Sequence, residues 1–463
     1  MALSRSARLG ALATAAASFC LIAAAPAPHP GSPGVGDPYF PLLGNGGFDV
    51  RHYGLDVAYN PDTDRLDGRT TITARATQNL SSFDLDLQKL QVTRIEVNGR
   101  RAKFTRDGDE IRISPRDHLR KHKTFTVTVT YGGVPEPLGG PIVFGSDYGW
   151  MKTTDGVFVA CEPNAASTWF PSSDHPMDKA AFDIRIKAPK GLTGVSNGRL
   201  VDTYSKGGQT VAHWRESKPM ATYLATATIG KFDVKTGRTP GGTPIYVAID
   251  PVLENSNNVD VYGVTAEVTD YWSKVFGPYP FEETGAIVDD MPQAGFSLET
   301  QTKPVYSAIR SESTIAHELA HQWFGDSVTP EKWSDIWLNE GFATYSQWLW
   351  SEHKGTQTAR EAFLAGYNSR PADAPFWQIV VGDPQRDTMF ASAVYQRGAM
   401  TLQVLRERIG DKAFFKLLPA WAAQNRYGNA DTADFVRLAE KISGKQLDAL
   451  FETWLFTKGK PAL

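Results

Sequence analysis

Two histidines and a glutamate lie close together in the segment TIAHELAHQWFGD, residues 314–326. His317 and His321 are four residues apart, so on an α-helix both imidazoles face the same side and can bind one metal ion. Glu318 lies beside them, where its carboxylate can reach a metal-bound water without binding the metal. The apolar residues around them are typical of a helix that is buried on one face. The pattern predicts a zinc site with a general base next to it.

A catalytic zinc ion needs a third protein ligand and keeps one position open for water. One arrangement takes a third histidine six residues after the second, but Ser327 occupies that place. The other takes a glutamate from a following helix. The segment WLNEGFATY, residues 337–345, has apolar residues at helical spacing and supplies Glu340, with eighteen residues between it and His321. We therefore predict that His317, His321 and Glu340 bind the zinc ion.

The alternative interpretation is a pair of packed helix histidines with an unrelated surface glutamate. The segment HLRKH, with His118 and His122, has the same histidine spacing, but no acidic residue lies between them and a strand-like segment follows. Around His317 the acidic residue is present, and a matching glutamate segment follows. This combination rarely arises by chance, so it favours the metal site.

The segment HELAHQWFGD followed by WLNEGFATY resembles the gluzincin aminopeptidases, the aminopeptidase N family that includes leukotriene hydrolase. Two further segments extend the resemblance: EPNAASTWFPSSDHPMDKAAFDIRI at residues 162–186 and VYQRGAM at residues 394–400. The similarity runs from about residue 48 to the C-terminus, and its motifs are specific. The resemblance implies one zinc ion per chain and peptide substrates.

Roles for further residues follow from this resemblance. It implies that Glu318 is the general base for a zinc-activated water and that Tyr395 stabilises the oxyanion formed on the substrate. Family members bind the α-ammonium group of the substrate through a glutamate on an edge strand and a second residue of the β domain. In this sequence Glu299, in GFSLETQT, and Glu162, in ACEP, match those positions.

The sequence also departs from the family pattern near the predicted amine site. Leu298 and Thr300 replace the methionine and asparagine that flank the family's glutamate, and Gly295 lies four residues before Glu299 instead of three. Ala160 stands where many relatives have glutamine. The edge strand that pairs with the substrate backbone is therefore expected to have a different shape.

The leading hypothesis is an exported zinc aminopeptidase that hydrolyses the N-terminal peptide bond of peptides. Two alternatives stay open: a zinc endopeptidase on the same scaffold, or an inactive peptide-binding homologue. The sequence ends about 120 residues after Glu340, without the large C-terminal helical domain of many relatives. From this we expect a more open cleft with access for longer peptides.

The order of elements predicts a chain of several regions. Residues 1–27 have a positive start, an apolar alanine-rich stretch and small residues typical of a secretory signal peptide. Residues 28–47 form a Pro- and Gly-rich lead-in. Residues 48–238 alternate like strands and are expected to form an all-β, saddle-like domain. Residues 239–463 are expected to form a thermolysin-like catalytic domain that passes from α/β structure to helices.

Local signals place individual elements within these regions. The segments VNGR at residues 97–100 and SNGR at residues 196–199 carry the Asn-Gly signal of tight hairpins. Residues 258–276 have the pattern of an amphipathic helix, and TGAIVDD at residues 284–290 has that of a strand.

Composition limits the partners that we expect. The formal net charge of −3 gives no reason to predict a nucleic-acid partner. Cys20 would leave with the signal peptide, and Cys161 would then be the single cysteine of the mature chain. We expect a secreted, extracellular monomer that has no membrane segment after cleavage, with retention in the cell envelope as the alternative.

Overall fold

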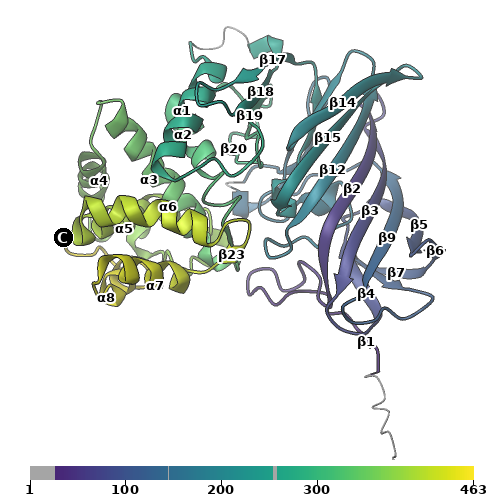
Figure 1. The fold of residues 1–463 in the computed structure, drawn as a ribbon, viewed down its shortest axis with the longest axis horizontal. Helices are drawn as coiled ribbons and strands as arrows, with labels where there is room; N and C mark the ends of the chain where they lie inside the picture. The colour runs from purple at the N-terminus through teal and green to yellow at the C-terminus, as the bar shows by residue number, and fades with distance from the viewer. Residues whose placement is uncertain (1–26, 144, 254–257) are drawn as a thin grey trace, which may run out of the picture.

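The computed structural model describes residues 27–143, 145–253 and 258–463. A β-rich N-terminal domain is followed by a domain that has a smaller sheet at one end and a group of helices beside it, so the predicted fold class is confirmed (Figure 1). The predicted signal peptide lies outside the described residues apart from Ala27. Within the described part of the chain, no helix has the length and apolar character needed to span a bilayer.

The N-terminal domain is built on a long eight-stranded sheet. Its order is β14-β15-β12-β2-β3-β9-β5-β6, and every neighbouring pair is antiparallel except β12 and β2. The strands of this sheet are β2 (Phe48–Asn60), β3 (Arg65–Ala76), β5 (Gln91–Val97), β6 (Arg100–Arg101), β9 (Thr124–Gly133), β12 (Ala180–Pro189), β14 (Arg199–Lys206) and β15 (Gln209–Met220).

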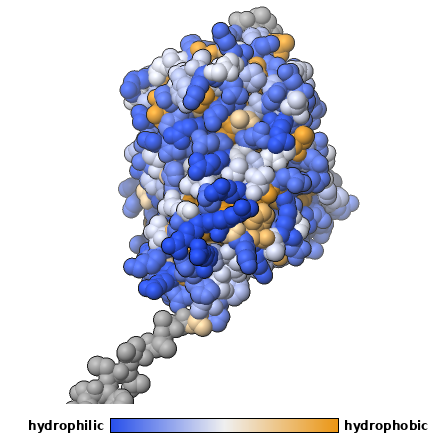
Figure 2. All heavy atoms as spheres, turned by 90° about the vertical axis from the view of Figure 1, so that its right-hand side faces the viewer, coloured by the Kyte–Doolittle hydropathy of each residue, from blue (hydrophilic) through white to orange (hydrophobic). Residues whose placement is uncertain are grey.

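Strict alternation of side chains gives this sheet one apolar and one polar face. In β9, Phe125, Val127 and Val129 are buried, while the threonines between them are exposed or partly exposed. Polar side chains accordingly predominate on the face of the N-terminal domain that looks away from the helices (Figure 2).

Two four-stranded sheets complete the N-terminal domain. The first has the order β1-β4-β8-β7 and comprises β1 (His29–Pro30), β4 (Leu80–Asp86), β7 (Lys103–Asp107) and β8 (Glu110–Ser114). The second has the order β10-β11-β16-β13 and comprises β10 (Gly149–Lys152), β11 (Val157–Ala160), β13 (Thr193–Ser196) and β16 (Ala227–Gly230).

The second domain begins with a five-stranded sheet of order β17-β18-β19-β21-β20. Its strands are β17 (Asp233–Arg238), β18 (Pro244–Ile249), β19 (Thr284–Val288), β20 (Ser297–Leu298) and β21 (Val305–Tyr306). Strand β17, which the sequence analysis placed before the expected boundary at residue 238, pairs along its whole length with β18 of this second sheet. The sheet to which β17 belongs depends on its hairpin partner β18. The alternation of side chains within a single strand does not identify that partner.

Helices make up most of the rest of the chain. They are α1 (Val261–Val275), α2 (Glu312–Ala320), α3 (Trp337–His353), α4 (Ala359–Asn368), α5 (Ser392–Ile409), α6 (Asp411–Gln424), α7 (Thr432–Ser443) and α8 (Asp448–Phe451). A short parallel pair, β22 (Thr329–Pro330) and β23 (Asn429–Ala430), links the segment after α2 to the segment before α7. The predicted helix at residues 258–276 and the strand at TGAIV are confirmed as α1 and β19.

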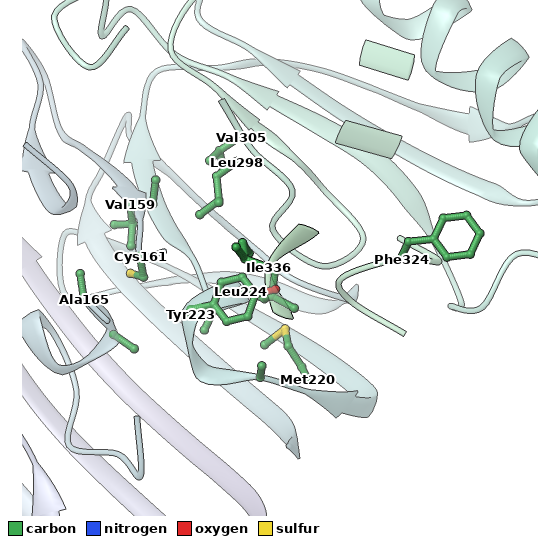
Figure 3. Packing of buried hydrophobic residues seen from close by; sticks show 14 of the residues in the cluster. Val159, Cys161, Ala165, Met220, Tyr223, Leu224, Leu298, Val305, Phe324 and Ile336 are labelled. Atoms are coloured by element: carbon green, nitrogen blue, oxygen red, sulfur yellow. The ribbon is translucent and has the colours of Figure 1, made fainter. Parts of the chain in front are cut away.

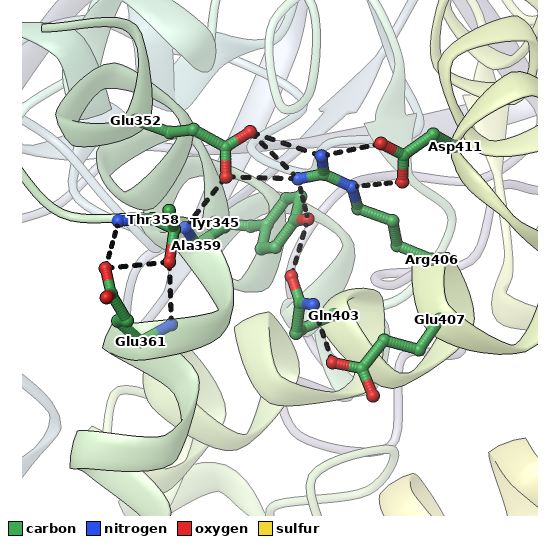
Figure 4. A network of polar contacts seen from close by, with 9 residues as sticks. All are labelled: Tyr345, Glu352, Thr358, Ala359, Glu361, Gln403, Arg406, Glu407 and Asp411. Carbon is green, nitrogen blue, oxygen red and sulfur yellow. Dashed lines mark hydrogen bonds and ion pairs between the residues drawn. The ribbon is translucent and has the colours of Figure 1, made fainter. Parts of the chain in front are cut away.

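A polar network links α3, α4, α5 and α6, with the backbone N–H of Ala359 at the start of α4 donating to Glu352 at 2.9 Å (Figure 4). Arg406 of α5 donates to Glu352 of α3 at 3.2 Å and to Asp411 of α6 at 2.9 Å. The hydroxyl of Tyr345 donates to Gln403 at 3.0 Å, which ties α3 to α5 a second time. Since α3 carries a predicted metal ligand in its first turn, this network fixes the helix that presents it.

The two Asn-Gly signals have different outcomes. The turn at Asn98 and Gly99 connects β5 to β6 as a hairpin, as predicted. The prediction of a tight hairpin at Asn197 and Gly198 is wrong, because the preceding β13 pairs with β16 whereas the following β14 pairs with β15. The chain changes sheet at this point instead of folding back.

The two domains share one continuous apolar core. Around their junction, one cluster contains Val159, Cys161 and Tyr223 of the N-terminal domain together with Leu298, Val305 and Ile336 of the second domain (Figure 3). All six side chains are buried. Burial of apolar surface between the domains therefore fixes their relative position.

Candidate metal centre

Helix α2 presents His317, Glu318 and His321 at one place. The helix begins at the N-cap residue Ser311, whose hydroxyl accepts a hydrogen bond from the backbone N–H of Thr314 at 3.2 Å. His317 and Glu318 lie in the last turn, and His321 caps the helix in helical conformation. The apolar face of α2 packs into the core, so the polar face looks into the cleft.

The first turn of α3 brings Glu340 to the two histidines. His317 Nε2 lies 3.2 Å from Glu340 Oε2, and His321 Nε2 lies 3.5 Å from the same oxygen. The two Nε2 atoms are 3.2 Å apart. Ligands at about 2.05 Å from a tetrahedral zinc ion are separated by roughly 3.3 Å, so the three donor atoms match a zinc site. Glu340 Oε2 is also buried and has no hydrogen-bond partner in residues 27–143, 145–253 and 258–463, as expected of an atom that binds a metal.

Both imidazoles are oriented by contacts on their other ring nitrogen. His317 Nδ1 contacts the side-chain oxygen of Gln347 at 3.2 Å, and His321 Nδ1 contacts the carbonyl oxygen of Phe324 at 3.0 Å. Each oxygen can accept only if Nδ1 carries the proton. In the neutral form of each imidazole, Nε2 is then the unprotonated nitrogen and can bind a metal.

Glu318 points into the same cavity but is not part of this triangle of donors. Its side chain is buried. Burial raises the pKa of Glu318 to about 7, although the adjacent His317 and His321 act in the opposite direction. A carboxyl group with this pKa can accept and release a proton near neutral pH, which suits a general base.

Glu299 directly follows β20, the edge strand of the second sheet. Its side chain is buried, and Oε1 has no hydrogen-bond partner among the residues that the structure describes. Burial raises the pKa of Glu299. An unpaired carboxylate of this kind is stabilised by a cation, so it can receive a positively charged group that enters the cavity.

Glu162 and Tyr395 approach from two other elements. Glu162 follows β11 of the N-terminal domain, and within the described part of the chain its buried Oε1 has no hydrogen-bond partner. Burial, with the nearby Glu299 next in importance, raises the pKa of Glu162 well above its usual value. Tyr395, on α5, stacks against His317 with ring centroids 6.2 Å apart. Its hydroxyl stays protonated because burial raises its pKa well above 10.

One cavity of about 200 Å³ joins all these groups. Each of the seven site residues predicted from the sequence lines it: Glu162, Glu299, His317, Glu318, His321, Glu340 and Tyr395. Four apolar side chains that the sequence analysis did not identify share the lining: Val143, Phe296, Leu298 and Phe390. Leu298 had been noted only as a departure from the family pattern, and no local signal marks Val143 or Phe390.

Comparison with known families supports the resemblance read from the motifs. Residues 50–224 match the peptidase M1 N-terminal domain, and residues 291–454 match the peptidase family M1 domain. Together the two matches include every predicted site residue.

Individual proteins are similar over large parts of the chain. The probable aminopeptidase 2 of Sulfurisphaera tokodaii is 30% identical over 64% of this chain, and aminopeptidase M1 of Arabidopsis thaliana is 29% identical over 65%. The aligned regions span 41% and 37% of those two proteins, so this chain matches less than half of each.

Solved structures match over nearly their full length. The crystal structure of an M1 zinc metallopeptidase from Deinococcus radiodurans has 29% identity and a TM-score of 0.86, covering 93% of this chain and 98% of that one. A mutant of that protein bound to a Tyr-Ser-Ala substrate gives 28% identity and the same TM-score, covering 93% of this chain and 99% of that one.

Proposed function

This chain belongs to the peptidase M1 family of zinc metallopeptidases, and from that premise we propose that it is an aminopeptidase that removes the N-terminal residue of peptides. The observation that carries the proposal is the pair of unpartnered, buried carboxylate oxygens on Glu162 and Glu299, which line the same cavity as the three metal-binding atoms. A peptide that places its α-ammonium group between them presents its first peptide bond to the metal site.

His317, His321 and Glu340 are the residues that hold the zinc ion in this proposal. The spacing of their donor atoms, 3.2–3.5 Å, supports this assignment. When bound, zinc supplies a Lewis acid that makes water more acidic and polarises the scissile carbonyl.

Glu318 is proposed to handle the proton of the reaction. Its carboxylate accepts a proton from the attacking water and then delivers it to the leaving amine, for which its pKa of about 7 is suitable. Tyr395 keeps its phenolic proton and donates a hydrogen bond to the oxyanion that develops on the substrate carbonyl. Both residues line the cavity, and neither is among the proposed metal ligands.

The free amine of the substrate is the group that distinguishes this proposal from an endopeptidase. We expect an aminoacyl anilide to be hydrolysed and its N-acetylated twin to resist hydrolysis, because the acetyl group removes the charge that Glu299 and Glu162 bind. Mass spectra of a digested long peptide should show a ladder that shortens from the N-terminus. Equal hydrolysis of both anilides, or a set of internal fragments, would instead identify an endopeptidase.

Export from the cell is a separate proposal that rests on residues 1–27. A positive start with Arg5 and Arg8, an apolar stretch and small residues near position 25 support it. Mass spectrometry of the protein recovered from the culture medium should give an N-terminus between about residues 25 and 30. Recovery of the uncleaved chain inside the cell would contradict it.

A further inference from the structure

The segment that carries Glu299 is held on both sides by side chains that do not line the cavity. Thr300, Gln301, Thr302 and Lys303, which follow Glu299, are fully buried. This segment turns sharply between β20 and β21, and Thr302 adopts a φ of +72°. A β-branched residue rarely has a positive φ, so the surroundings must impose this conformation.

Gln322, in the second domain, makes the first two hydrogen bonds to this segment. The side-chain oxygen of Gln322 accepts a hydrogen bond from the backbone N–H of Thr302 at 2.7 Å. The amide nitrogen of the same side chain donates to the carbonyl oxygen of Glu299 at 2.9 Å. Because Gln322 directly follows His321, these hydrogen bonds fix the position of the Glu299 backbone relative to the metal site.

Asn197 and Gly198, which lie between β13 and β14 in the N-terminal domain, make the other hydrogen bonds to this segment. Asn197 donates through its side-chain amide to the carbonyl oxygens of Gln301 and Leu224, both at 2.8 Å. The backbone N–H of Gly198 donates to the hydroxyl of Thr302 at 2.7 Å. Leu224 lies at the domain junction shown in Figure 3, so Asn197 bridges the two domains there.

These two positions admit few other residues. Asn197 is buried, and its side-chain oxygen also accepts the N–H of Thr226 at 2.9 Å, so both its donor and acceptor groups are used. Gly198 has a φ of +71°, and a Cβ atom there would lie 2.0 Å from the carbonyl oxygen of Arg215. The Asn-Gly pair, which forms no tight hairpin, thus has a structural explanation in the contact with residues 301–302.

We propose that Asn197 and Gly198 are positioning residues for substrate amine recognition. By holding Gln301 and Thr302 from the N-terminal domain, while Gln322 holds Thr302 from the metal side, they keep the Glu299 carboxylate one residue's distance from the scissile bond. The inference rests on the proposed function, since it assigns to Glu299 the binding of the α-ammonium group. Amine recognition is then a property of the domain junction and not of the metal domain alone.

The test compares two ligands that differ only in the amine. Isothermal titration calorimetry measures the binding of leucine hydroxamate, and of the same hydroxamate without the α-amine, to the zinc-loaded enzyme. The ratio of the Kd without the amine to the Kd with the amine gives the contribution of the amine. We expect this ratio to fall about tenfold in Asn197→Ala and in Thr302→Ala, because a displaced Glu299 would lose about one charge-assisted contact with the amine. Thr302→Ser keeps the hydroxyl and should retain the wild-type ratio.

Three further measurements distinguish a displacement of Glu299 from a general loss of structure. Zinc content and affinity for the hydroxamate without the amine should stay unchanged in all variants. Asn429→Ala is the matched control, because Asn429 also bridges the domains, through Pro176 and Pro330, without touching the Glu299 segment. It should keep the wild-type ratio.

Each outcome decides the inference. Folded Asn197→Ala and Thr302→Ala with the wild-type ratio would overturn it, and if Asn197→Ala does not fold, the Thr302→Ala and Thr302→Ser pair decides alone. A wild-type enzyme that binds both hydroxamates equally would show instead that the proposed amine site is wrong, and the inference would fall with it.

Discussion

At the scale of single residues, the cavity contains four carboxyl groups close to one another. Glu162, Glu299, Glu318 and Glu340 all line it, and burial raises the pKa of the first three. Carboxylates in such a place are stable in the ionised form only when cations compensate them. A zinc ion between the histidines and Glu340, and a substrate ammonium group between Glu162 and Glu299, would supply this compensation at two separate points. Charge balance thus favours binding of the metal and of a free amine together.

Glu318 is the residue whose replacement should separate chemistry from metal binding. Glu318→Gln keeps the size of the side chain but cannot accept a proton, so kcat on an aminoacyl anilide should fall by about 10²–10⁴. Zinc content, measured by atomic emission, should stay at the wild-type level. Glu312→Gln is the control on the same helix, since its partly exposed side chain pairs only with Lys354. Loss of zinc from Glu318→Gln would mean that Glu318 is a ligand.

Gln347 should control how tightly the metal is held. Its side-chain oxygen contacts His317 Nδ1 at 3.2 Å, and its amide nitrogen donates to Ser313 at 3.0 Å. Removing such a contact weakens metal binding about 10- to 100-fold, so Gln347→Ala should lose zinc to a chelator at correspondingly lower concentration. Gln347→Glu keeps an acceptor and should bind zinc at least as well as the wild type. Equal zinc affinity in the alanine variant would contradict this role.

The sequence predicted the polar residues that line the cavity but not those that hold them in place. His317, His321 and Glu340 could be predicted because helical periodicity and a fixed motif constrain them. Gln347 and Asn197 could not, because their roles depend on contacts with segments 30 and 104 residues away in the chain. Such contacts exist only after the elements have packed.

At the scale of elements, the eight-stranded sheet carries a cross-strand charge cluster near its β14 edge. Asp183 on β12 contacts His52 on β2 at 3.0 Å, His213 on β15 at 2.7 Å and Arg215 on β15 at 2.9 Å. Burial opposes ionisation of Asp183, but the contacts with His213, Arg215 and His52 outweigh it and lower its pKa to about 2. The carboxylate therefore joins three neighbouring strands.

This cluster predicts a loss of stability in acid. Because the pKa of Asp183 is lower in the folded chain than in the unfolded chain, its contribution is complete above about pH 4 and is lost as the pH falls toward 2. Because solvent screens this partly exposed cluster, its contribution to the free energy of unfolding is roughly 1–2 kcal/mol. Asp183→Asn should lower the free energy of unfolding by about this amount at neutral pH in urea denaturation, and the difference from the wild type should shrink at about pH 3.

Asp67→Asn provides the comparison for this prediction. Asp67 lies on β3 of the same sheet, is exposed and pairs only with the exposed Arg65. Its replacement should change the free energy of unfolding by less than about 0.5 kcal/mol at either pH. An equal effect of both variants would show that Asp183 contributes no more than a surface charge.

At the scale of the whole molecule, the lead-in predicted at residues 28–47 holds the two domains together through side-chain contacts. Residues 29–30 of this lead-in form the strand β1, and the rest is irregular and partly buried. Tyr39 donates from its hydroxyl to Asp383, at 2.5 Å, and Phe40 packs edge-on against Trp333, both in the second domain. A Pro- and Gly-rich segment has no periodicity, so these contacts could not be read from the sequence, whereas the alternation of β9 and the periodicity of α1 could.

Asp37 is the residue through which this segment should most affect the stability of the whole chain. Its buried carboxylate accepts the backbone N–H groups of Tyr39 at 2.8 Å and of Trp333 at 2.9 Å, and it contacts His175 Nε2 at 3.2 Å. Asp37→Ala leaves these groups buried without a partner and should lower the free energy of unfolding by about 3–5 kcal/mol in urea denaturation. It should also speed limited proteolysis within residues 28–47, whereas Asp62→Ala, at an exposed turn, should do neither. Unchanged stability in Asp37→Ala would mean that the shared apolar core alone holds the lead-in and the two domains together.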